Sequence, residues 1–159
     1  MSHLRQHNFL KQCLNNDIAA IALCECLFSI SQVWDDMIDK DILVSGDTLN
    51  KTFWLLLFDL PSNPFYLEHH EFLMPIVQLA VIDWLSANEL ERGSDHDKEL
   101  AYVLRNSLTA VVIACARIIG GYEWMLKYTP IIRRFFQDES LINYKKELSH
   151  GLRRRRIRT

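Results

Sequence analysis

Glycine and proline are scarce in this chain, which holds five glycines and four prolines among 159 residues. Alternating apolar and polar runs bounded by turn-forming residues are also missing, and a sheet-rich fold needs many of both. Apolar residues instead recur at three- and four-residue spacing almost throughout. This periodicity predicts an all-α protein. At this length we expect a single-domain bundle of about six helices.

A few residues mark where the expected helices begin and end. Pro64 fits the first position of a helix, Gly120 and Gly121 together mark a helix end, and Pro75 predicts a kink. The bundle is expected to fill residues 1–150, ahead of a basic and disordered tail at 151–159. The expected helices run over about residues 2–14, 17–41, 48–60, 64–92, 95–120 and 122–136, with a short terminal helix from about 138–140.

Cysteine is also scarce, with four residues in all. Cys13, Cys24, Cys26 and Cys115 have apolar flanks, and the C-x-C pair lacks the second pair that a metal site would need. We expect reduced thiols inside the core of a cytoplasmic protein. The N-terminal stretch is too polar for a signal peptide. The longest apolar run, at residues 108–116, is too short to span a bilayer.

The formal net charge is only −2, but it is unevenly distributed. Five of the 18 Lys and Arg residues lie in the last nine positions, which leaves 13 basic against 20 acidic residues in 1–150, a net charge of −7. Such an acidic body argues against nucleic-acid binding by the whole domain. The arginines of the tail, Arg153–Arg156 and Arg158, are expected to be solvated. Weak contact with RNA or an anionic surface is the alternative.

The chain does contain an acidic cluster within an apolar helix, in the stretch ECLFSISQVWDDMIDKD at residues 25–41. Carboxylates one turn apart repel each other, and a divalent cation relieves this repulsion. Asp35, Asp36 and Asp39 are therefore candidate Mg²⁺ ligands. The alternative is that these carboxylates simply face solvent, although the solvent-facing side of a helix usually carries charges of both signs. At 100° per residue, a narrow polar seam contains Glu25, Ser29, Gln32, Asp36 and Asp39, with Asp35 at its edge.

The run SQVWDDMIDKD resembles the first aspartate-rich motif of the class I isoprenoid synthases. This superfamily contains trans-prenyltransferases, squalene-type synthases and terpene cyclases. The resemblance covers about a dozen of the 159 residues. It implies an all-α bundle around an apolar cavity. It also implies that Asp35, Asp36 and Asp39 hold Mg²⁺ ions, which bind the diphosphate of a small-molecule substrate.

The same resemblance implies roles for other residues. The family's second metal motif is matched by Asp83, Ala87 and Glu91, so Asp83 and Glu91 would be further metal ligands. Ala87 stands where the family has a hydroxyl or an acid, and the chain is much shorter than the family's catalytic domains. Arg105 and Arg117 would contact phosphate oxygens as catalytic groups, or else pair with acids of the body. The pocket for a hydrocarbon chain would be lined by Phe28, Gln32, Phe53, Trp54 and Trp84.

Three other functions fit parts of the sequence. A non-catalytic interaction or structural protein, including a homo-oligomer, requires no chemical site. An all-α nucleoside-triphosphate pyrophosphohydrolase would use Asp36-x-x-Asp39 and Glu68-x-x-Glu71 as its two acidic pairs. Neither a Gly-rich phosphate loop nor a nucleophilic Ser or Cys motif is present. A metal phosphohydrolase would combine the Glu68–Glu71 run with Asp83 or His96-Asp97, and with Asp138.

Overall fold

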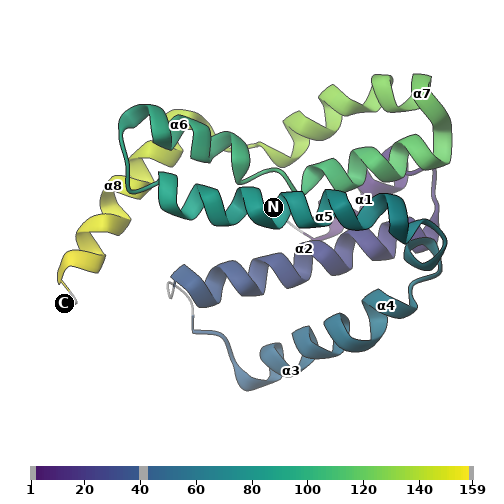
Figure 1. The fold of residues 1–159 in the computed structure, drawn as a ribbon, viewed down its shortest axis with the longest axis horizontal. Helices are drawn as coiled ribbons and strands as arrows, with labels where there is room; N and C mark the ends of the chain where they lie inside the picture. The colour runs from purple at the N-terminus through teal and green to yellow at the C-terminus, as the bar shows by residue number, and fades with distance from the viewer. Residues whose placement is uncertain (1–2, 40–42, 158–159) are drawn as a thin grey trace.

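The computed structural model describes residues 3–39 and 43–157, and the side chains of all of them except Asp39 and residues 151–157. This part of the chain is helical and contains no strand, so the all-α prediction is confirmed. In chain order the elements are α1 (His3–Cys13), α2 (Ile18–Asp39), α3 (Gly46–Trp54), the π-helix η1 (Leu55–Asp59), α4 (Leu60–Ser62), α5 (Pro64–Leu90), α6 (Asp95–Leu104), α7 (Thr109–Phe136) and α8 (Leu141–Ile157) (Figure 1).

Several helix boundaries follow from local hydrogen bonding. The side chain of Asn63 caps α5 by accepting a hydrogen bond from the backbone N–H of Tyr66 at 2.9 Å, and Pro64 takes the first helical position. Ser94 and Asp97 form a capping box at the start of α6. The sequence predicted that Pro64 opens one helix and that another begins at about residue 95, because both signals depend on residues that are neighbours in the chain; it did not identify the Asn63 cap.

Other details of the helix prediction are wrong. We predicted about six helices, and the described chain divides differently. One reason is that residues 46–62, predicted as one helix and a loop, form three consecutive segments, α3, η1 and α4. The kink in α5 lies at His69, with φ −120° and ψ 15°, and not near Pro75. The single helix expected over 95–120 is interrupted by turns at 105–108. The expected boundary between bundle and tail at residue 150 stays a prediction, and the backbone of α8 is helical through Ile157.

The core lies where α1, α2, α5 and α7 meet. Figure 1 shows α2 and α5 side by side, with α3 and α4 next to α2 and with α7 next to α5. The two helices run parallel, since Asn63 Nδ2 donates to the Ala19 carbonyl at 2.9 Å near their first turns and Trp84 bonds to Asp35 near their last. Fully buried side chains of this core include Leu10, Leu14, Leu23, Leu73, Val111, Val112 and Ile132.

The cysteines are free thiols, and three of the four belong to this core. Cys13, Cys24 and Cys115 are buried, and Cys26 is half-buried. Burial raises the pKa of Cys13 to about 12 and the pKa of Cys26 to about 11. Both thiols are therefore protonated at neutral pH, so they act as small apolar side chains, as the sequence predicted.

Among the residues that the structure describes, two stretches are long and apolar enough to cross a bilayer by length and composition alone. They are Ile18–Ile38, in α2, and a window within Asp95–His150. Neither stretch is an uninterrupted apolar run, because each contains scattered polar residues. Core helices of soluble proteins meet the same criterion when they are mostly buried, whereas 28% of the α2 window and 33% of the other window are buried here. Cytoplasmic location stays a prediction.

α7 folds back on itself at the glycine pair. Gly121 has φ 76° and ψ −166°, a combination that is open essentially to glycine alone. The chain therefore reverses direction between an arm at 109–120 and an arm at 122–136, as the green hairpin in Figure 1 shows. Arg133 Nη1 joins the arms by donating to Thr109 Oγ1 at 2.7 Å. The sequence predicted a helix end here, and the glycine backbone turns that end into a hairpin.

Replacing Gly121 with alanine should lower the free energy of unfolding by about 1–3 kcal/mol, because a Cβ makes this backbone conformation strained. An added Cβ has open space at Gly121, so the effect is one of backbone conformation and not of crowding. The measurement is urea denaturation followed by circular dichroism. Gly46→Ala is the matched control, because Gly46 also has open space but no positive φ. Equal losses in both variants would contradict this explanation.

Candidate functional site

Arg105, which caps the C-terminus of α6, joins carboxylates from two other helices. Its Nε and Nη2 donate to the two oxygens of Glu91 at 2.5 Å and 2.9 Å. Its Nη1 donates to Asp35 Oδ1 at 2.9 Å, and Nη2 also donates to Asn88 Oδ1 at 2.8 Å. One guanidinium thus connects α2, α5 and α6, with the bidentate geometry that makes arginine–carboxylate pairs strong.

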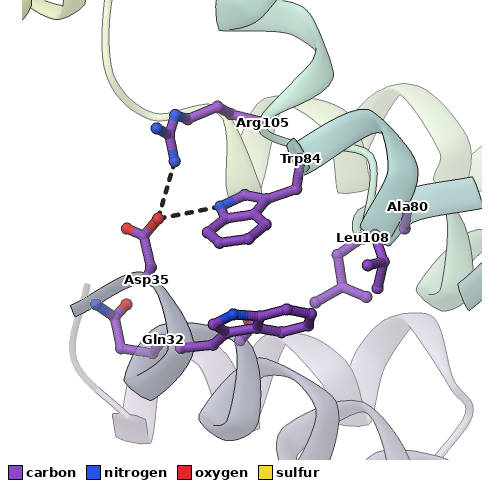
Figure 2. Close-up of a pocket in the computed structure, with 9 residues that line it drawn as sticks. Gln32, Asp35, Ala80, Trp84, Arg105 and Leu108 are labelled. Atoms are coloured by element: carbon purple, nitrogen blue, oxygen red, sulfur yellow. Dashed lines mark hydrogen bonds and ion pairs between the residues drawn. The ribbon is translucent and has the colours of Figure 1, made fainter. Parts of the chain in front are cut away.

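An indole and a phenol complete this cluster. Trp84 Nε1 donates to Asp35 Oδ1 at 3.0 Å, and Figure 2 shows that Trp84 and Arg105 point at the same carboxylate oxygen. The hydroxyl of Tyr144, on α8, donates to Glu91 Oε1 at 2.5 Å. We call the whole set the Arg105 network. It consists of Asp35, Trp84, Asn88, Glu91, Arg105 and Tyr144.

The network contains two carboxylates and one guanidinium, so its formal charge is −1. Burial alone would lower the pKa of Arg105, but the hydrogen bonds and negative charges of Glu91 and Asp35 outweigh burial and raise that pKa above its ordinary value. Burial and the hydrogen bond to Glu91 likewise raise the pKa of Tyr144. Arg105 is therefore charged and Tyr144 is protonated at neutral pH, and both act as hydrogen-bond donors.

The structure brings together members of the two predicted metal motifs, but with an arginine between them. Asp35 of the first motif and Glu91 of the second bind the same guanidinium. Asp36 is half-buried and accepts a hydrogen bond from Gln32 Nε2 at 3.1 Å. The side chain of Asp39 lies outside the described residues. Within the described residues, no three His, Cys, Asp or Glu side chains form a group that could hold a metal ion. The Mg²⁺ site stays a prediction.

Asp83 and Arg117 lie in a different place from the Arg105 network. Asp83 Oδ2 accepts a hydrogen bond from Ser107 Oγ at 2.6 Å. The guanidinium of Arg117 lies over the ring of Phe72, 5.4 Å from its centroid. Both residues line a groove between α5 and α7. Of the two predicted catalytic arginines, only Arg105 therefore belongs to the cluster that contains Asp35.

A small cavity adjoins the Arg105 network. Gln32 and Trp84, both predicted as pocket residues, line it together with Asp35 and Arg105 (Figure 2). Its volume is about 180 Å³, below the roughly 300–1,000 Å³ of most ligand pockets. The other three predicted pocket residues lie elsewhere. Phe28 stacks on Phe136, and Phe53 and Trp54 are exposed on α3.

The two acidic pairs of the pyrophosphohydrolase alternative are not adjacent. α2 and α5 run parallel, and Trp84 lies beside Asp35 near their last turns. Glu71 is thirteen residues before Trp84 on α5, which is about 20 Å at 1.5 Å per residue. Asp36 and Glu71 therefore lie at different levels of the bundle. In the phosphohydrolase alternative, Asp97 is already engaged in the capping box of α6.

The sequence did not indicate Asn88 and Tyr144 of the Arg105 network, nor Ser107, the partner of Asp83 in the groove. Asn88 lies three residues before Glu91, so helical spacing could have placed both on one face. Tyr144 and Ser107 had no such local indication. Each meets its partner, Glu91 or Asp83, only through packing between helices that are distant in the chain.

Arg105→Met should lower the free energy of unfolding by about 3 kcal/mol, because two partly buried carboxylates lose their cation. Arg105→Lys should lose less, since it keeps the charge but not the fork of donors. Both values come from urea denaturation at neutral pH. The control is Arg92→Met, which removes an exposed ion pair with Glu89 at 3.2 Å and should change stability by at most about 1 kcal/mol. A similar small loss for Arg105→Met would show that the network is not a stabilising element.

Comparison with protein-family models, with curated proteins and with solved structures finds no match to this chain. The resemblance to class I isoprenoid synthases therefore depends on the SQVWDDMIDKD motif alone.

Proposed function

We propose that this chain is a non-catalytic helical assembly protein that associates with a second copy of itself through the outer side of α3 and η1. The observation that carries the proposal is a set of large apolar side chains on this segment, all at least 40% exposed. We call this set the α3–η1 face. It consists of Phe53, Trp54, Leu56, Leu57 and Phe58.

Exposure of this kind is costly for a monomer. Leu57 and Trp54 are 62% and 60% exposed, and burying such a side chain fully contributes about 1.5–3 kcal/mol. Exposed contiguous apolar patches on soluble proteins usually mark interaction sites, and Trp and Phe are enriched at interface cores. The Trp54 indole N–H already bonds to Asp59 at 3.1 Å. Its polar atom is therefore satisfied, and its ring can pack against a partner without an unmet hydrogen bond.

The total surface of the chain supports an assembly. Its accessible area is 10394 Å², whereas a compact monomer of 18.7 kDa has roughly 8,300 Å². The excess of roughly 2,000 Å² is more than the roughly 800 Å² that each partner contributes to a standard interface. The exposed apolar side chains of the α3–η1 face account for part of this surface, to which every exposed element of the chain contributes.

A second copy fits this face better than a membrane or a charged partner does. Between residues 46 and 62 the only charged residues are Asp47, Lys51 and Asp59. Two copies of a nearly neutral face can approach within an otherwise acidic protein, and a two-fold axis would pair the same residues with each other. Helices that bind membrane surfaces are instead rich in Lys and Arg on their polar side.

The hydrogen bonds within the Arg105 network favour a structural function for this cluster of polar side chains. Asp35 and Glu91 each accept at least two hydrogen bonds, and Arg105 donates four. These groups are already paired with one another. A cluster whose hydrogen-bond donors and acceptors bond to one another stabilises the junction between its helices, and it does not require a substrate to do so.

Native protein should elute as a dimer, with about twice the mass of 18.7 kDa, in size-exclusion chromatography with light scattering at about 100 µM. Trp54→Glu and Leu57→Glu should each shift it to the monomer, because each places a charge in the contact; loss of such an anchor costs about 2 kcal/mol or more. Val103→Glu is the control, since Val103 is 65% exposed on α6, away from this face. A monomeric native protein, or one that binds neutral vesicles through this face, would contradict self-assembly.

Mg²⁺-dependent binding of an isoprenoid diphosphate is the second candidate function. Among the described residues, Asp36 accepts a side-chain hydrogen bond from Gln32 alone, so carboxylate oxygen remains for a cation. If this function holds, Mg²⁺ with pyrophosphate should raise the melting temperature of the native protein but not that of Asp36→Asn. The measurement is a thermal shift. No Mg²⁺-dependent rise in the native protein would rule this candidate out.

A further inference from the structure

A second, larger cavity lies between α5 and the two arms of the α7 hairpin. Its volume is about 520 Å³, within the range of ordinary ligand pockets. We call it the α5–α7 groove. It contains three charged side chains, Asp83, Arg117 and Arg133. Its remaining lining is mainly apolar and includes Phe72, Ile76, Leu79, Ile113 and Met125.

The two arginines of the groove lack a carboxylate partner. Within the described residues, neither Arg117 nor Arg133 forms an ion pair of 4.0 Å or less, in contrast to Arg105. Both arginine side chains are exposed. Unpaired guanidiniums beside an apolar cavity are suited to an anion that comes from outside the chain.

Both guanidiniums are held in place by neighbouring side chains. Arg117 lies over the ring of Phe72, and Arg133 donates to the buried hydroxyl of Thr109 at 2.7 Å. A pre-positioned guanidinium loses less conformational entropy when it binds, and its planar fork matches a carboxylate or a phosphate. The contacts therefore prepare the two side chains for an anionic group without neutralising them.

We infer that the α5–α7 groove binds an amphipathic anion, with a carboxylate or phosphate headgroup on an alkyl chain. The headgroup would contact Arg133 or Arg117, which lie toward opposite ends of the groove beside Thr109 and Phe72, and the chain would cover the apolar walls. Asp83 reduces the formal charge of the groove from +2 to +1, and its carboxylate is engaged by Ser107. The sign of the groove therefore remains positive. A small ion such as inorganic phosphate would leave the apolar walls exposed.

The groove depends on the hairpin at Gly121 and not on the α3–η1 face. Its lining comes from α5, from the turn before α7 and from both arms of α7. Arg133 and Arg117 are on opposite arms, so the reversal of the chain is what brings them to one cavity. Binding in the groove can therefore be tested separately from self-association.

The test uses the full chain and the fluorescent probe dansylaminoundecanoic acid. We expect saturable fluorescence enhancement that laurate and dodecyl phosphate reverse but dodecanol does not, because only the first two carry a negative headgroup. The ratio of the laurate to the dodecyl phosphate constants identifies the preferred headgroup. No enhancement, or equal displacement by dodecanol, would overturn the inference. Trp54→Glu should bind the probe as the native protein does, which excludes binding at the α3–η1 face.

Removing a positive charge from the groove should weaken probe binding, and removing its negative charge should strengthen probe binding. Arg133→Gln or Arg117→Gln, whichever removes the arginine that holds the headgroup, should weaken probe binding about tenfold, the effect of losing one charge-assisted hydrogen bond. Asp83→Asn should tighten binding, because it removes a like charge while keeping an oxygen for Ser107. Arg134→Gln is the matched control, since Arg134 neighbours Arg133 but does not line the groove, and it should stay within twofold. Equal affinity in all four variants, each with an unchanged circular dichroism spectrum, would contradict recognition by the groove.

Discussion

The contact between Arg105 and the carboxylates of Glu91 and Asp35 is the constraint on which this bundle depends. It connects α2, α5 and α6 at the end of the molecule farthest from the Asn63 cap, and Tyr144 extends it to α8. Buried carboxylates are tolerated only when a cation and hydrogen-bond donors compensate for lost solvation. Every helix that contributes to the network is therefore held in one register, because displacement of any of them would leave a charge without its partner.

The positions of the exposed features follow from this arrangement. The core uses α1, α2, α5 and α7, so α3 and η1 cover only one side of α2 and keep their largest side chains outside. The turn at 105–108 that places Arg105 in its network also separates α6 from α7 and starts the hairpin. The α3–η1 face and the α5–α7 groove are thus consequences of how few helices the core can enclose.

The acidic seam illustrates how far a helical projection can go. Angular spacing placed Asp35 at the edge of a polar stripe, and Asp35 is indeed the residue that turns away from Asp36 toward α5. The resemblance, and not the projection, implied that Glu91 faces the acidic helix. It could not identify what lies between them, since Arg105 is 70 residues from Asp35 in the chain. A metal-binding motif and a pair of carboxylates joined by an arginine can have the same local pattern of acidic residues.

The sequence by itself determined the helical class, Pro64 at the start of α5, the helix end at Gly120–Gly121 and the burial of cysteines, which holds for three of the four. Each depends on residues within a few positions of one another or on apolar periodicity, and both are readable along the chain. Only the tertiary structure decided that Arg105 joins Asp35 to Glu91, that Asp83 and Arg117 share a separate groove, and that Phe53 and Trp54 face outward. These outcomes depend on which helix faces meet, and competition among many apolar faces for one core is settled by packing and not by local pattern.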